Sequence, residues 1–263
     1  MKIGLIYFIS FAFLAALSFM VFAQNEQGST RKGDDWSKLK LVINTPQQVY
    51  LLGEPVRLNF KLVNEGSRKT ISPPCASIED GYMGIHVSLA GGPFKRQYGS
   101  RSRFQVDGCL EPPHALEPGE SFTDVATVLW NVKPEVAGLS DFASKQLAKE
   151  RIMSDYAFPE AGLYSIKTVL YLPGQGGKTL QSEPIQVILT EPVGEDLVVW
   201  DQIKNSREFA YFLQYGEFLT LKPAEQKAVL KNLEDIVAAH PNSVYSIRIR
   251  QSLEKLRAEK KFR

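Results

Sequence analysis

Apolar and polar side chains alternate with a period of two over much of residues 38–192. The clearest run is VRLNFKL at 56–62. Since successive side chains of a strand point to opposite faces, this run predicts a half-buried strand. Similar runs bounded by Gly, Pro or Asn predict further strands at residues 39–43, 49–52, 85–89, 122–130, 163–172 and 185–190. About seven short strands, most without a helix between them, predict a mainly β domain built as an antiparallel β-sandwich.

After Pro192 the apolar period changes to that of a helix. Pro223 begins and His240-Pro241 ends one predicted helix, and Asn242 or Ser243 can cap the next. Apolar residues at helical spacing line both helices, for example Val229, Leu230, Leu233, Ile236 and Val237 in the first. We therefore expect a β domain over residues 38–192 and a helical C-terminal region over 193–263. Helix formers at 142–150 predict one more helix, inserted before the penultimate strand.

The first 23 residues have the features of a secretory signal peptide. Lys2 precedes an uncharged run from Ile3 to Ala23, which ends in Val21-Phe22-Ala23. We expect cleavage after Ala23, followed by a polar, disordered leader at residues 24–37. The alternative is an uncleaved membrane anchor. Cleavage predicts a protein exported to the periplasm or the extracellular medium, with no membrane contact afterwards.

Composition limits the chemistry that is available. The formal net charge is +2, so nothing favours nucleic acid as a partner. The chain has three His and two Cys, and no His stands next to another ligand type at metal spacing, so we expect no metal site and no cofactor. No Gly-x-Ser-x-Gly elbow occurs. Dispersed carboxylates, such as Glu117, Glu120 and Asp124, leave glycoside hydrolysis as the remaining catalytic route. The prediction is a protein that is not an enzyme.

One segment combines cations with aromatic residues. Residues 94–104, FKRQYGSRSRF, contain the candidate binding residues Lys95, Arg96, Tyr98, Arg101 and Arg103. Such a mixture can bind a glycan or a polyanion through charge and stacking. The alternative is a solvated hairpin whose aromatic rings pack inward.

Three segments carry a recognisable pattern: LGEPVRLNFKLVNEG at 52–66, LEPGESFTDVATVLWNV at 116–132 and FPEAGLYSIKTVLYL at 158–172. Together they resemble immunoglobulin-like domains of secreted bacterial proteins and the bacterial intracellular proteinase-inhibitor family. The resemblance implies an antiparallel immunoglobulin-like β-sandwich. It also implies structural roles for Trp130, Gly162 and Tyr164, the last two within a tyrosine corner. The stretch at 238–256 is similar to tetratricopeptide-type helices.

These observations favour an exported, non-catalytic binding module that acts through protein–protein contacts. The expected partner is an envelope or extracellular protein. Two alternatives stay open. The resemblance implies a secreted proteinase inhibitor, and the segment at 94–104 suggests an accessory domain for glycans or polyanions.

Export also predicts a disulfide bond between Cys75 and Cys109, the two cysteines of the chain. The alternative is two unpaired thiols. The bond would close a loop of about 34 residues and contribute roughly 3–4 kcal/mol in the chain-entropy model. Thiol titration of the denatured, unreduced mature protein should therefore detect no free thiol, and titration after reduction should detect both. Free thiols before reduction would contradict the bond.

Overall fold

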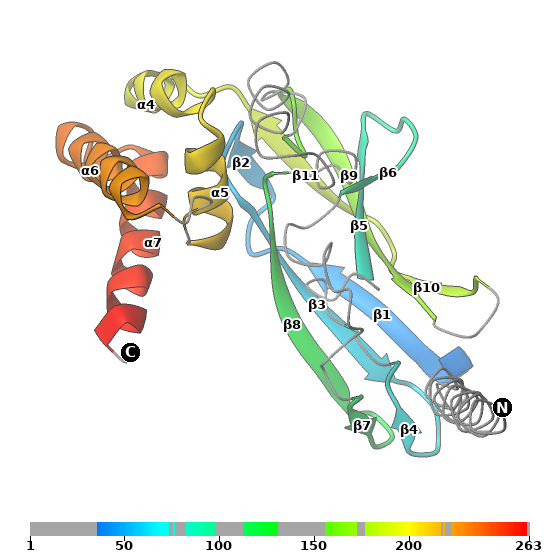
Figure 1. Ribbon diagram of the computed structural model, residues 1–263. Coiled ribbons are helices and arrows are strands. Elements are labelled where there is room, and N and C mark those ends of the chain that lie inside the picture. Colours follow the sequence, from blue (N-terminus) through cyan, green and yellow to red (C-terminus); the bar gives the residue numbers. More distant parts are fainter. Residues whose placement is uncertain are drawn as a thin grey trace, which may run out of the picture.

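The computed structural model describes residues 36–73, 76, 83–97, 113–130, 156–172, 177–216, 218 and 222–261. This part of the chain consists of β-sheets followed by four C-terminal helices, which gather at one end of the β part (Figure 1). The predicted mainly β class with a helical C-terminal region is confirmed. The helix predicted at 142–150 lies outside the described residues.

The strands form two main sheets and a small ribbon. The smaller sheet has the order β1-β3-β8, and the larger has the order β2-β11-β9-β5-β6, with β10 also paired to β9. β2 and β11 run parallel, while the other described pairs are antiparallel. The bounds are β1 Leu39–Asn44, β2 Val49–Leu51, β3 Val56–Asn64, β4 Thr70–Ile71, β5 Met83–Leu89, β6 Lys95–Gln97, β7 Ala115–Leu116, β8 Ser121–Val128, β9 Gly162–Tyr171, β10 Thr179–Gln181 and β11 Ile185–Thr190. β4 and β7 pair as the ribbon.

Each predicted strand has a counterpart in the structure. The strands that the pattern missed are β4, β6, β7 and β10, which have two or three residues each and are too short to show a period. The folded part also begins earlier than expected, because the predicted leader at 24–37 overlaps a short 3₁₀ helix at Trp36–Lys38. Trp36 is buried there, and its Nε1 donates to the carbonyl oxygen of Ile71 at 2.8 Å.

One hydrophobic core joins the two main sheets. On β3, Val56, Leu58, Phe60 and Leu62 are buried, as the period of two predicts. They belong to the same buried cluster as residues of the larger sheet, among them Val87, Ile166 and Val187. The inward face of each sheet therefore contributes to a shared core, and the alternate residues of each strand point away from it.

The C-terminal helices are α4 Glu195–Ile203, α5 Arg207–Tyr215, α6 Pro223–Ala239 and α7 Val244–Lys261. α6 begins at Pro223 and has His240 as its C-cap, as predicted. α7 contacts the other three helices. Its first turn is capped from α4, because the Asp196 carboxylate accepts bonds from Val244 N at 2.7 Å and Ser243 Oγ at 2.8 Å.

A second buried cluster attaches the helices to the β part. It combines Leu52, Leu129, Trp130 and Tyr156 with helix residues such as Trp200, Phe212 and Tyr245. The Tyr245 hydroxyl donates to the carbonyl oxygen of Leu52 at 2.5 Å, and the Gln214 side-chain oxygen accepts from Leu129 N at 2.9 Å. The helical region therefore packs on the β domain.

Gly53 gives a direct test of this attachment. Its φ is +82°, and an added Cβ would lie 2.1 Å from Trp200 Cζ3. Gly53→Ala should therefore lower the free energy of unfolding by about 2–4 kcal/mol, from backbone strain together with overpacking, measured by urea denaturation.

Gly119→Ala is the matched control. Gly119 has a φ of +81°, but nothing lies within 4 Å of an added Cβ. This variant should lose only the conformational part, about 1–2 kcal/mol. Equal losses for the two variants would contradict the tight contact between Gly53 and Trp200.

Candidate functional site

The candidate site is the outer face of the larger sheet, which points away from the shared core. On β9 the core residues Tyr164 and Ile166 alternate with Leu163, Ser165 and Lys167. The pairing register continues these three outward positions onto the neighbouring strands. Directly paired residues point to the same face, so the outer face consists of successive rows across the strands.

The first row, here called the apolar row, consists of Val49, Ile188 and Leu163. Ile188 of β11 lies opposite Val49 of β2 and opposite Leu163 of β9. Their exposed fractions are 54%, 43% and 43%. Single exposed apolar residues are normal on a protein surface, but here three are direct neighbours. The row is a continuous apolar strip across three strands.

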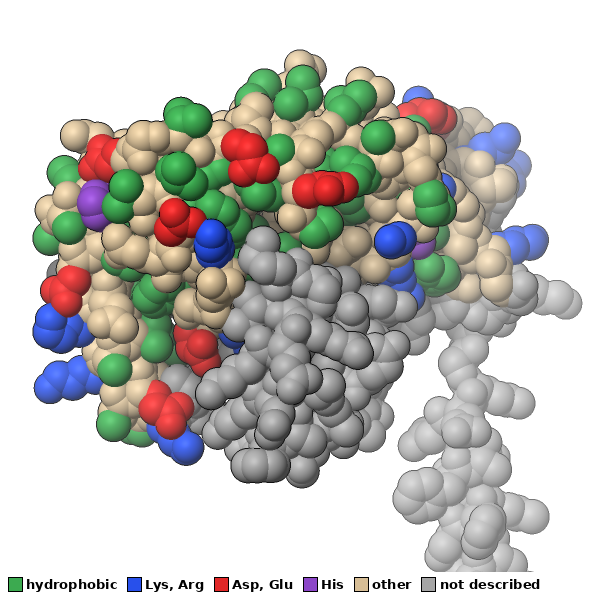
Figure 2. Space-filling model, turned by 90° about the horizontal axis from the view of Figure 1, so that it is seen from above, with side chains coloured by type: hydrophobic (Ala, Val, Ile, Leu, Met, Phe, Trp, Pro, Cys, Tyr) green, Lys and Arg blue, Asp and Glu red, His purple; other side chains and the backbone are tan. Residues whose placement is uncertain are grey.

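The next outward row is polar and contains Gln186, Ser165 and Ser88. The row beyond it, here called the cationic row, consists of Arg96, His86 and Lys167. His86 of β5 lies opposite Arg96 of β6 and opposite Lys167 of β9. The two permanent cations, Arg96 and Lys167, therefore lie on the same face on either side of His86. In the view from above, hydrophobic side chains reach the described surface, and Lys and Arg side chains lie next to a histidine near its right-hand end (Figure 2).

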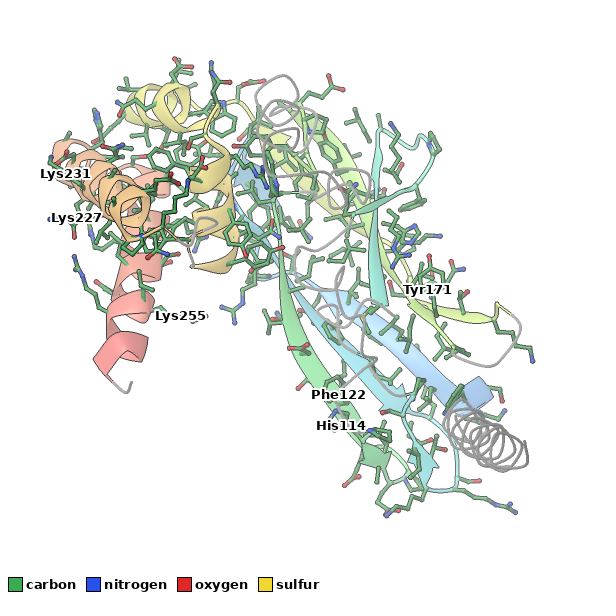
Figure 3. All side chains as sticks on the ribbon, in the orientation of Figure 1. His114, Phe122, Tyr171, Lys227, Lys231 and Lys255 are labelled. Atoms are coloured by element: carbon green, nitrogen blue, oxygen red, sulfur yellow. The ribbon has the colours of Figure 1, made fainter. Side chains whose placement is uncertain are left out.

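Aromatic rings hold both permanent cations of this row. The Cζ atom of Arg96 lies 4.8 Å from the centroid of the Tyr171 ring. Lys167 Nζ lies 4.6 Å from the centroid of the Phe94 ring and donates to Gln181 Oε1 at 3.0 Å. Figure 3 shows Tyr171 on the sheet close to β10. Cation–π contacts of this kind reduce the freedom of long side chains.

Gly84 makes room for this arrangement. It lies on β5 with its position facing outward, where an added Cβ would be 3.0 Å from Arg96 Nε and 3.4 Å from His86 Nε2. A glycine inside a strand commonly marks a close approach by another group. Here the approaching groups are the side chains of Arg96 and His86.

The surroundings of His86 favour its neutral form. Its Nε2 is buried and has no hydrogen-bond partner among the described residues. Burial lowers the pKa of His86, and the charges of Lys167 and Arg96 lower it further.

Two of the five predicted binding residues, Lys95 and Arg96, lie in the described part of the chain. Arg96 joins the cationic row, whereas Lys95 is exposed and lies opposite Val87, a core position. Phe94, which one reading of the sequence packed inward, lies against Lys167. Tyr98, Arg101 and Arg103 lie outside the described residues, as do Cys75 and Cys109. Sequence reasoning missed Lys167 and Tyr171, whose only signal was their place between the apolar residues of the strand at 163–172.

The three residues predicted to have structural roles each lie in close contact with other parts of the β domain. The Tyr164 hydroxyl donates to the Glu160 carbonyl oxygen at 2.8 Å, which is the hydrogen bond expected of a tyrosine corner. Burial raises the pKa of this phenol. Trp130 packs edge-on against Tyr156, with ring centroids 5.3 Å apart. An added Cβ on Gly162 would lie 3.0 Å from Leu89 Cδ1.

Two of the candidate carboxylates and one of the histidines contact neighbouring groups in the fold. Glu117 pairs with Lys69 at 2.7 Å, and the Glu120 carboxylate accepts from Glu117 N at 2.8 Å. His114 stacks on Phe122 with ring centroids 4.1 Å apart (Figure 3). Within the described ranges, no group of three or more His, Cys, Asp or Glu is arranged to hold a metal ion. None of the described helices has the length and apolar character needed to span a membrane.

Comparison with known proteins gives no family. No family model and no curated protein matches the chain. Among solved structures, the β-glucosidase EmGH1 of Erythrobacter marinus aligns at 11% identity and a TM-score of 0.29, over 58% of this chain and 15% of that one. The sporulation control protein Spo0M of Bacillus subtilis aligns at 13% identity and a TM-score of 0.29, over 64% of this chain and 55% of that one. The CARDB domain of PF1109 from Pyrococcus furiosus aligns at 10% identity and a TM-score of 0.26, over 59% of this chain and 96% of that domain.

The chain thus spans less than two thirds of the length of the first two of these proteins. Similarity at such TM-scores carries no argument about function, and the β-glucosidase match does not make this chain a catalyst.

The lowered pKa of His86 predicts a pH dependence of stability. Below about pH 6.5 the unfolded chain binds a proton at His86 more readily than the folded chain does, so His86 contributes to the loss of stability as the pH falls. In His86→Gln the free energy of unfolding should fall less between about pH 7 and about pH 5 than in the wild type. Lys167→Met should give a smaller reduction of the same sign, because burial is the larger cause. Equal falls in wild type and His86→Gln would contradict this assignment.

Proposed function

We propose that this chain is an exported, non-catalytic binding module, an immunoglobulin-like β-sandwich that binds an envelope or extracellular protein through the outer face of its larger sheet. The observation that supports this function is the apolar row, in which Val49, Ile188 and Leu163 are exposed and in register across three strands. A continuous strip of exposed apolar side chains is typical of a protein-binding surface.

The smaller sheet provides the contrast. Its exposed apolar residues are Val42 and Val125, with exposed fractions of 36% and 45%. Val42 lies opposite Lys61, and Val125 lies opposite Asn59. In the described strands of this sheet, therefore, each exposed valine has a polar neighbour instead of an apolar one, and no comparable strip forms.

Energetics indicate how large the contact must be. Covering a half-exposed aliphatic side chain contributes about 1 kcal/mol, so the apolar row supplies about 3 kcal/mol. A stable complex buries about 800 Å² on each partner. The partner must therefore also cover neighbouring residues. The polar row lies on one side, and the segment after β11 carries further exposed residues, Val193, Leu197 and Val198. A partner with an apolar centre and a polar rim fits this surface.

Ile188→Lys tests the proposal at the centre of the row. A lysine there would have to be desolvated against the apolar part of a partner, which should weaken binding about tenfold or more. Affinity capture of envelope proteins by the mature chain, quantified by mass spectrometry against the wild type, measures the loss for each captured protein.

The control is Val125→Lys, which makes the same exchange at a similarly exposed strand position. It should leave capture unchanged, and both variants should unfold at the wild-type denaturant concentration because both positions are exposed. Capture that survives Ile188→Lys, or that is lost equally in both variants, would place the binding surface elsewhere.

A further inference from the structure

We propose that the cationic row of Arg96, His86 and Lys167 binds a tetrahedral oxyanion, either inorganic sulfate or phosphate or a sulfate or phosphate group esterified to a sugar. This site is separate from the apolar row, and the proposal does not depend on the proposed protein contact.

The first argument is the placement of charge. Arg96, His86 and Lys167 come from three adjacent strands and lie at directly opposite positions. Lys167 donates to the neutral Gln181 side chain, and no carboxylate pairs with it in the described part of the chain. Two permanent cations on either side of a histidine repel each other. An oxyanion bound by both would replace this repulsion by attraction.

The second argument is that the site is built in advance. Because Gly84 has no side chain, Arg96 Nε and His86 Nε2 can pack closely over its backbone. Tyr171 and Phe94 each hold one of the two permanent cations against a ring face. Fixing these side chains before binding reduces the entropy lost when a ligand arrives. Because each of these rings already packs against a cation, the site suits an anionic group better than the stacking of a neutral sugar.

The third argument is the role of His86. Its buried Nε2 has no partner among the described residues, and the charged groups facing it are Arg96 from β6 and Lys167 from β9. Tyr171 is the other titratable side chain of β9 on this face. A bound oxyanion would oppose the field of the two cations and favour protonation of His86. Binding should therefore take up a proton and strengthen as the pH falls.

NMR titration of the mature chain tests the site. The chain has three histidines, so His86→Gln assigns the His86 ring signal. The probes are inorganic sulfate, inorganic phosphate and a sulfated disaccharide, with acetate at matched ionic strength as the reference. Sulfate should shift the His86 signal with saturation and raise the pKa read from that signal. Tighter binding of the disaccharide supports a sugar-borne group, and equal binding supports the free ion.

Lys167→Met should weaken sulfate binding about tenfold or more, while Lys167→Arg should retain it. Lys95→Met is the matched control, since it removes the same charge beside Arg96 but from an exposed position opposite Val87. An unchanged unfolding midpoint in each variant excludes misfolding. The proposal is overturned by a shift of the His86 signal that does not saturate with sulfate, or by equal losses of sulfate binding in Lys95→Met and Lys167→Met. An equal response to acetate would also overturn it, because it would indicate binding of protein carboxylates or ionic screening alone.

Discussion

The turn at residues 52–54, between β2 and β3, is the constraint on which the arrangement of the β and helical parts depends. The side chain of Glu54 is 4% exposed, and its Oε1 accepts from Arg248 Nη2 at 2.8 Å and from Gln47 Nε2 at 3.2 Å. Its Oε2 accepts from Leu51 N at 3.1 Å. A buried carboxylate is costly unless such donors surround it, so Glu54 requires Arg248 of α7 in this place. Leu52 and Gly53 add contacts to Tyr245 and Trp200.

This turn also determines the position of the apolar row. β2 carries Val49 at the edge of the larger sheet, and Leu52 N donates to the carbonyl oxygen of Thr190 at 2.8 Å, just past the last paired residues of β2 and β11. β11 then leads through residues 191–194 into α4. The strands that contribute Val49 and Ile188 are thus held at one end by the helices. The helical region acts as a support for this face of the sheet.

The regular elements were predictable because their signal is local. The alternation over 56–62 and the helical stripe after Pro223 each report which side of one element is buried, and the structure agrees with both. Trp36 was missed because a single buried aromatic in a polar segment has no period. The cationic row was predictable only in part. His86 lay on the polar side of its strand and Arg96 in a basic run, but their meeting with Lys167 depends on strand register, which no local pattern encodes. The contact between Glu54 and Arg248 was not anticipated either, because it joins residues 194 positions apart in the sequence.

The two rows on the outer face are separated enough to work independently. Leu163 and Lys167 are four residues apart on β9, which corresponds to about 13 Å at the rise of an extended strand. This distance exceeds the Debye length of about 8 Å at physiological ionic strength, so charge bound at the cationic row is largely screened at the apolar row. Sites more than about 10 Å apart without shared partners usually contribute additively. A small oxyanion would therefore engage one row alone, whereas a protein covering the apolar row would need an extended contact to reach both.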